Sequence, residues 1–142
     1  MSVQMILLPL FVQVLLTFFL GFYLAILRRK ALAQRKTRWE DIALREPNWP
    51  KETMQAGYSF ANQFELPVLF YVLTILALFT KQADLLFVVM AWIFVLSRAV
   101  QAYIHVTSNY VPLRGIAFAV GCATLFVMWV IYIVRILTLP WP

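Results

Sequence analysis

The chain has 142 residues, of which 63% are hydrophobic and 13% charged, and its mean hydropathy is +0.83. A soluble domain carries about 25% charged residues, so this composition excludes an ordinary soluble protein and indicates one membrane domain. The net charge of +6 does not indicate nucleic-acid binding, because the basic residues lie beside one membrane end and acidic residues are interspersed among them.

Four apolar stretches are long enough to cross a membrane, which needs about 20 helical residues. They predict an all-α integral membrane protein with four transmembrane helices in an up-down-up-down bundle. The predicted spans are residues 5–27, 58–80, 85–104 and 113–134. The first span is followed directly by Arg28 and Arg29 and has no charge before it, so it is interpreted as a retained helix and not as a cleaved signal peptide.

The segment between the first two spans, residues 28–57, carries a cluster of eight basic residues. They are Arg28, Arg29, Lys30, Arg35, Lys36, Arg38, Arg45 and Lys51. Under the positive-inside rule this loop is cytoplasmic and both termini are non-cytoplasmic. Attraction to anionic membrane lipid is a secondary role that such a cluster supports.

Two ionisable residues interrupt the middle of the chain. If Glu65 and Arg98 marked membrane ends, the apolar stretches 66–80 and 85–97 would hold only 15 and 13 residues. Both helices are therefore expected to continue past these charges, which places a carboxylate and a guanidinium inside the bilayer. Ionisable groups there are costly and indicate a functional site.

Helical spacing places further polar residues beside these two. The second and third spans are antiparallel neighbours, and residues three or seven positions apart share one helix face. The predicted seam near the cytoplasmic side consists of Asn62, Glu65, Arg98, Gln101 and His105. Arg114 opens the fourth helix on the same side, where it could hold an anion.

Each seam residue also has a purely structural interpretation. The Glu65–Arg98 pair could staple two helices, and the amides could hydrogen-bond between helices. His105 could be an interfacial side chain, and Arg114 could only set the topology. The convergence of all these polar residues in one leaflet nevertheless favours a pocket that is open to the cytoplasm. A metal site is not expected, because His105 and Cys122 are the only His and Cys.

The sequence N-Q-F-E-L-P at residues 62–67, followed by Arg98 and by P-L-R ending at Arg114, resembles the MAPEG family. These are the membrane-associated proteins in eicosanoid and glutathione metabolism. The resemblance covers residues 58–134. The run from Arg98 to Arg114 is most similar to bacterial members, which implies a bacterial inner membrane.

The resemblance implies a homotrimer that binds glutathione as co-substrate between neighbouring subunits. On the matching positions, Asn62 and Glu65 would contact glutathione from the second helix, and Arg98, Gln101 and His105 would line the site from the third. Arg114 would hold and activate the thiol. Lipophilic electrophiles or hydroperoxides would enter from the bilayer. The implied activity is a glutathione-dependent transferase or peroxidase.

The chain also departs from the glutathione-using members of that family. Some relatives carry arginines where this chain has Tyr58 and Ala61, and a serine can stand where it has Gly115. These changes remove partners for the glutathione carboxylates. Because the family includes the five-lipoxygenase-activating protein, a scaffold, the alternative is a non-catalytic lipid-binding or scaffold trimer.

Overall fold

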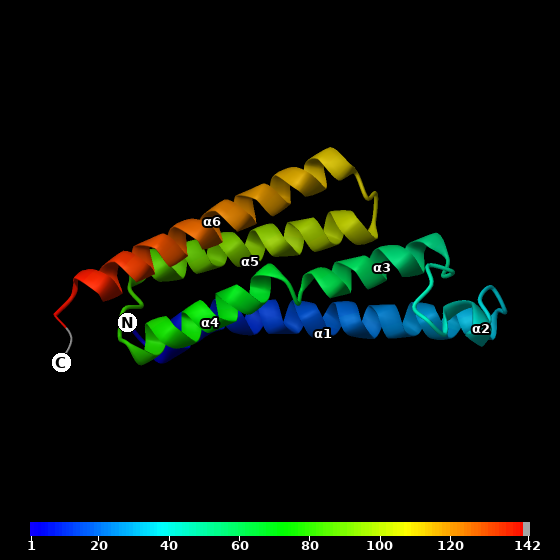
Figure 1. Ribbon diagram of the computed structural model, residues 1–142, viewed down its shortest axis with the longest axis horizontal. Coiled ribbons are helices and arrows are strands. Elements are labelled where there is room, and N and C mark those ends of the chain that lie inside the picture. Colours follow the sequence, from blue (N-terminus) through cyan, green and yellow to red (C-terminus); the bar gives the residue numbers. More distant parts are fainter. Residues whose placement is uncertain (141–142) are drawn as a thin grey trace.

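The computed structural model describes residues 1–140. Their helices are α1 (Val3–Ala33), α2 (Trp39–Ile42), α3 (Lys51–Asn62), α4 (Leu66–Phe79), α5 (Leu85–Val106) and α6 (Val111–Thr138). The long helices lie alongside one another, with the α1–α3 and α5–α6 connections at one end and the α4–α5 turn at the other (Figure 1).

Four segments of the described chain are long and apolar enough to cross a membrane, which confirms the prediction of a multi-pass membrane protein. They are Val3–Ala33, Lys51–Phe79, Leu85–Val106 and Val111–Thr138. Each helix extends the predicted span by a few residues, except that Thr80 caps α4 instead of belonging to it. At 1.5 Å per residue, these lengths allow the helix ends to project beyond the hydrocarbon core.

The second span is not one continuous helix. α3 ends at Asn62 and α4 begins at Leu66, so the expectation that this helix continues through Glu65 is wrong. The cause is Pro67, which lacks an N–H and whose ring would collide with the carbonyl group four residues earlier, at Gln63. Asn62 and Glu65 therefore do not share the face of a single helix. The third span does continue past Arg98, as predicted, and ends at Val106.

The apolar core lies on the α4–α5 side of the bundle. Phe70 and Phe94 are fully buried, and their ring centroids are 4.9 Å apart. α5 and α6 are in tight contact at Gly121, where an added Cβ would lie 2.6 Å from Ser97 Oγ. Small residues at such contacts let two membrane helices pack backbone to backbone.

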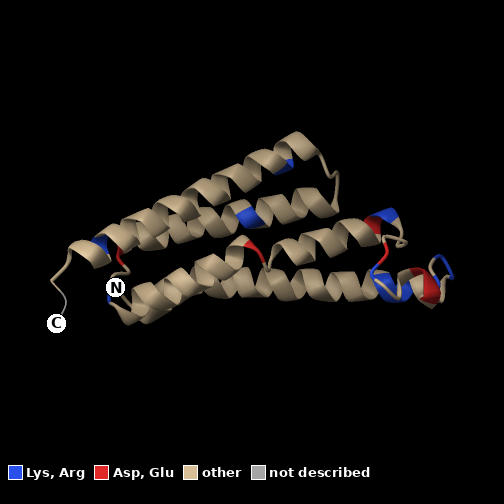
Figure 2. Ribbon diagram, in the orientation of Figure 1, with Lys and Arg blue, Asp and Glu red and all other residues tan. Residues whose placement is uncertain are grey.

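Charge is distributed very unevenly over the molecule. Most Lys, Arg, Asp and Glu residues gather at the end that carries α2, and the helices in between are nearly free of them (Figure 2). At the opposite end, Arg135 and Asp84 form a salt bridge of 2.9 Å that ties the end of α6 to the start of α5. The bundle is thus apolar along its length and ionic at both ends.

Candidate functional site

A groove of about 390 Å³ opens between α3, α5 and α6 near the α2 end of the bundle. Its lining consists of Tyr58, Asn62, Gln101, His105, Arg114, Gly115 and Phe118. Four of the six predicted site residues therefore line one space, although they come from three helices. The other two, Glu65 and Arg98, are not part of this lining.

Arg98 lies directly behind the groove. It is only 1% exposed, and its Nη1 donates a hydrogen bond of 2.6 Å to Gln101 Oε1. Its Nη2 donates a second bond of 3.0 Å to the backbone carbonyl oxygen of Asn62. That carbonyl is accessible because the helix stops there. It also accepts a turn hydrogen bond of 3.3 Å from the Glu65 N–H, and Arg98 adds a charged donor at a helix break that a membrane would otherwise leave poorly satisfied.

Glu65 is placed differently from the prediction. Its side chain is exposed, and within residues 1–140 it forms no ion pair with Arg98. The interpretation of Glu65 and Arg98 as an ion pair that staples two helices is therefore wrong within one subunit. The physical reason is the helix break, which gives Arg98 a backbone acceptor in place of the carboxylate.

His105 is buried, with 6% of its surface exposed. This histidine therefore packs inside the protein near the end of α5 and is not an exposed side chain. Within the described chain, its Nδ1 has no hydrogen-bond partner. Because buried polar atoms are nearly always hydrogen-bonded, this nitrogen is free to bond a water molecule or a ligand in the groove.

Arg114 reaches the groove from the first turn of α6. Its Nη1 donates a hydrogen bond to Asn109 Oδ1, which fixes one side of the guanidinium and leaves other N–H groups for a ligand. Asn109 has a φ of 52°, a left-handed conformation that asparagine tolerates better than most residues, and its N–H bonds the carbonyl oxygen of Ile104 at 2.7 Å. The positive end of the α6 dipole adds to the attraction for an anion.

One buried polar contact was not predicted. Gln13 of α1 is fully buried and donates a hydrogen bond of 2.8 Å to Gln63 at the helix break. Gln63 in turn donates to the carbonyl oxygen of Ser59 at 2.9 Å. The available signal was a single amide side chain inside an otherwise apolar first span, because such groups seek partners on other helices.

The groove brings together one guanidinium, two amides and one imidazole around an opening beside the membrane. This set suits a polar ligand that carries negative charge, with Arg114 as the cation. Within residues 1–140, no group of three or more His, Cys, Asp or Glu residues is arranged to hold a metal ion.

The chain was compared with known protein families, with curated proteins and with solved structures. The sequence model of the MAPEG family matches residues 6–134, which is most of the chain. No curated protein and no solved structure matched it in the corresponding comparisons. The match includes all the residues that line the groove.

Proposed function

Because this chain belongs to the MAPEG family, we propose that it is a glutathione-dependent membrane transferase or peroxidase. Its substrates would be lipophilic electrophiles or hydroperoxides. The observation that carries the proposal is the single groove lined by Asn62, Gln101, His105 and Arg114. A polar site at the membrane lets a soluble thiol meet a substrate that is dissolved in the bilayer.

In this proposal Arg114 activates the thiol. A guanidinium beside a thiol in a site of low polarity favours the thiolate, which is the reactive nucleophile. The thiol proton passes to water, the thiolate sulfur forms a bond to the electrophilic carbon, and the leaving group, such as a halide, departs with its bonding electrons. With a hydroperoxide, the thiolate attacks the outer oxygen and the O–O bond breaks to release the alcohol. A second glutathione then reduces the resulting sulfenic acid to glutathione disulfide and water. The hydrogen bond from Arg114 to Asn109 Oδ1 keeps the guanidinium oriented, so little reorganisation is needed when the thiolate forms.

The other groove residues would hold the peptide part of glutathione. Asn62, Gln101 and His105 offer amide and imidazole groups to its carboxylates and peptide bonds. Arg98 would act as a positioning residue, because both of its hydrogen bonds go to protein groups, Gln101 Oε1 and the Asn62 carbonyl oxygen. Glu65 would contact glutathione from the helix break.

We also propose that the protein is a homotrimer with its sites between subunits. Glu65 supports this, because it is exposed on one subunit although it lies between apolar segments, and a carboxylate facing lipid is costly. A neighbouring subunit would cover it. Mass measurement in detergent should give three chains, and a stable monomer would contradict the proposed assembly.

The basic segment 28–57 supports a cytoplasmic location for the α2 end and a non-cytoplasmic location for both termini. The proposed compartment is a bacterial inner membrane. A reporter enzyme that works only outside the cytoplasm should be active when it is fused after Pro142. A cytoplasmic signal would place the groove on the wrong side for a cytosolic thiol.

The alternative is a lipid-binding or scaffold trimer. Tyr58 and Phe118 give the groove an apolar rim, and no atom lies within 4 Å of a Cβ added at Gly115. The groove would therefore have room for an acyl chain. It also lacks the arginine that some family members carry at the position of Tyr58.

Two measurements on the detergent-purified protein separate these functions. Glutathione should raise the melting temperature, since a ligand that binds only the folded state stabilises it. The protein should also conjugate glutathione to a lipophilic aryl halide. If a fatty acid stabilises the protein while glutathione neither stabilises it nor reacts, the scaffold function is correct.

A further inference from the structure

A second groove lies at the end of α1, away from the candidate site. Its volume is about 660 Å³, and its lining consists of Arg28, Arg29, Leu32, Ala33, Trp39, Ile42 and Trp49. It combines two cations, two indole rings and three aliphatic side chains. The guanidinium of Arg28 lies over the ring of Trp49, 5.2 Å from its centroid, which is within the range of a cation–π interaction.

The length of α1 places this groove at the level of lipid headgroups. α1 has 31 residues and is thus about 46 Å long, whereas the hydrocarbon core is about 30 Å thick. Its continuous apolar run ends at Leu27, and the basic residues begin at Arg28. The last turns of α1 therefore project beyond the hydrocarbon core, where phosphates of the adjacent leaflet lie.

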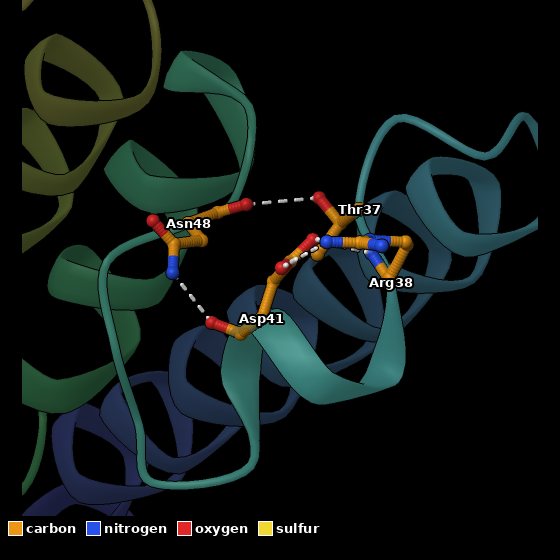
Figure 3. A network of polar contacts seen from close by, with 4 residues as sticks. All are labelled: Thr37, Arg38, Asp41 and Asn48. Carbon is orange, nitrogen blue, oxygen red and sulfur yellow. Dashed lines mark hydrogen bonds and ion pairs between the residues drawn. The ribbon is translucent and has the colours of Figure 1, made fainter.

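The far wall of the groove is held in place by a polar network (Figure 3). Thr37 Oγ1 donates to the carbonyl oxygen of Asn48 at 3.0 Å, and Asn48 Nδ2 donates to the carbonyl oxygen of Asp41 at 2.6 Å. Arg38 pairs with Asp41 at 3.3 Å. The network residues adjoin Trp39 and Trp49 in the chain, so the network holds the backbone that carries both tryptophans.

The charges of the groove are available to a ligand. Asp41 is engaged by Arg38, and within residues 1–140 neither Arg28 nor Arg29 forms a salt bridge with an acidic residue. Two neighbouring arginines match a phosphate, which accepts paired N–H bonds. Indole rings are favoured at the boundary between headgroups and acyl chains.

We propose that this groove is a binding site for the phosphate headgroup of an anionic phospholipid in the adjacent leaflet. Arg28 and Arg29 hold the phosphate, and the two tryptophans pack against the glycerol region. Leu32, Ala33 and Ile42 contact the first carbons of the acyl chains. The site is separate from the proposed catalytic groove and does not depend on the proposed activity.

The test is a lipid titration of the full chain in detergent, read by native mass spectrometry. Phosphatidylglycerol should remain bound, whereas phosphatidylcholine with the same acyl chains should not. Because hydrogen bonds from a guanidinium to a phosphate are charge-assisted and stronger than neutral ones, Arg28→Gln combined with Arg29→Gln should weaken retention about 20-fold or more.

The matched control removes the same charge from the same segment outside the groove. Arg35→Gln combined with Lys36→Gln should weaken retention clearly less than the first pair, because neither residue lines the groove. Equal weakening by the two pairs would overturn the proposal, because it would reflect general attraction to the basic segment. Equal retention of phosphatidylcholine would overturn it as well.

Two further arms complete the test. Trp49→Leu keeps both arginines and should still weaken retention several-fold by removing the cation–π contact. If the double arginine variant fails to fold, Trp49→Leu replaces it as the test. Unchanged retention by Trp49→Leu would then overturn the proposal. Glycerol 3-phosphate carries the same phosphate without acyl chains. If it binds as tightly as the lipid, the site is one for soluble anions and the lipid proposal is wrong.

Discussion

Arg98 of α5 donates a hydrogen bond of 3.0 Å to the carbonyl oxygen of Asn62, the last residue of α3. This contact couples a buried cation to a helix break, because the break exposes the acceptor and the cation satisfies it. The same guanidinium holds Gln101 in the wall of the groove. The shape of the candidate site therefore depends on a residue that does not line it.

This arrangement predicts coupling between Arg98 and Gln101. Arg98→Met and Gln101→Leu should each lower the free energy of unfolding by about 1–3 kcal/mol, because each leaves a buried partner unsatisfied. The double variant should lose less than the sum of the two, since the second change removes the stranded group. Unfolding in mixed micelles measures all three variants.

A second double-mutant cycle, which combines Arg98→Met with Glu65→Gln, serves as the control. Because these side chains form no ion pair within residues 1–140, their coupling energy should be smaller than that between Arg98 and Gln101. A coupling energy here as large as that between Arg98 and Gln101 would mean that the carboxylate does meet the guanidinium in the membrane.

Arg114→Ala should reduce conjugation or peroxidase turnover by about 10²–10³, the usual loss for a preorganised charge donor. Melting temperature and oligomeric mass should stay close to those of the unchanged protein. Arg114→Lys should restore only part of the activity, because an ammonium group lacks the guanidinium fork. The control is Lys36→Ala, which removes one positive charge far from the groove. Full activity in Arg114→Ala would assign this residue to topology alone.

Gly121→Ala should destabilise the bundle by about 1–3 kcal/mol, the usual cost of overpacking. The added methyl group would lie 2.6 Å from Ser97 Oγ, so α5 and α6 would have to move apart. Adding Ser97→Ala should recover part of the loss. Gly115→Ala in the same helix is the control, because its Cβ would meet open space. Equal effects at the two glycines would show that helix propensity, and not the close contact, governs the result.

The Asp84–Arg135 salt bridge predicts a dependence of stability on pH. Burial raises the pKa of the Asp84 carboxyl, but the Phe87 N–H and Arg135 lower it by more, so it lies below its ordinary value of 3.8. The ionised Asp84 carboxylate therefore contributes its full stabilisation above about pH 3.8. This stabilisation is lost as the pH falls through the folded-state pKa. Since both side chains are about one-third exposed or more, the contribution should be below about 1 kcal/mol.

Thermal unfolding between pH 5 and pH 3 measures this effect. Asp84→Asn should reduce the loss of melting temperature on acidification, whereas Lys81→Gln in the same turn should leave it unchanged. Identical acid profiles for Asp84→Asn and the unchanged protein would show that the salt bridge does not contribute.

Much of the fold was predictable because hydropathy decides it. α1, α5 and α6 follow the apolar stretches, and α5 continues past Arg98 as its length required. The break between α3 and α4 was missed although Pro67 was visible in the sequence. A proline near a helix start is tolerated and one inside a helix is not, and span length alone does not distinguish the two cases.

Four of the seven residues that line the groove were predicted from the sequence, but their hydrogen bonds were not. Spacing brought Asn62, Gln101, His105 and Arg114 to one end of the bundle, and they line one groove. The partners of Arg98 could not be predicted, because one of them is a backbone carbonyl freed by the break. Side-chain patterns contain no information about such an acceptor.

The bond between Gln13 and Gln63 has a consequence for the order in which the protein assembles. The two residues are 50 positions apart in the chain, so α1 is synthesised before its partner exists. During that interval the amide of Gln13 lies in an apolar helix without its native acceptor, at a cost that only a second helix can remove. Pairing of the first two spans is therefore favoured as soon as the second is inserted, before the groove-forming α5 and α6 are made.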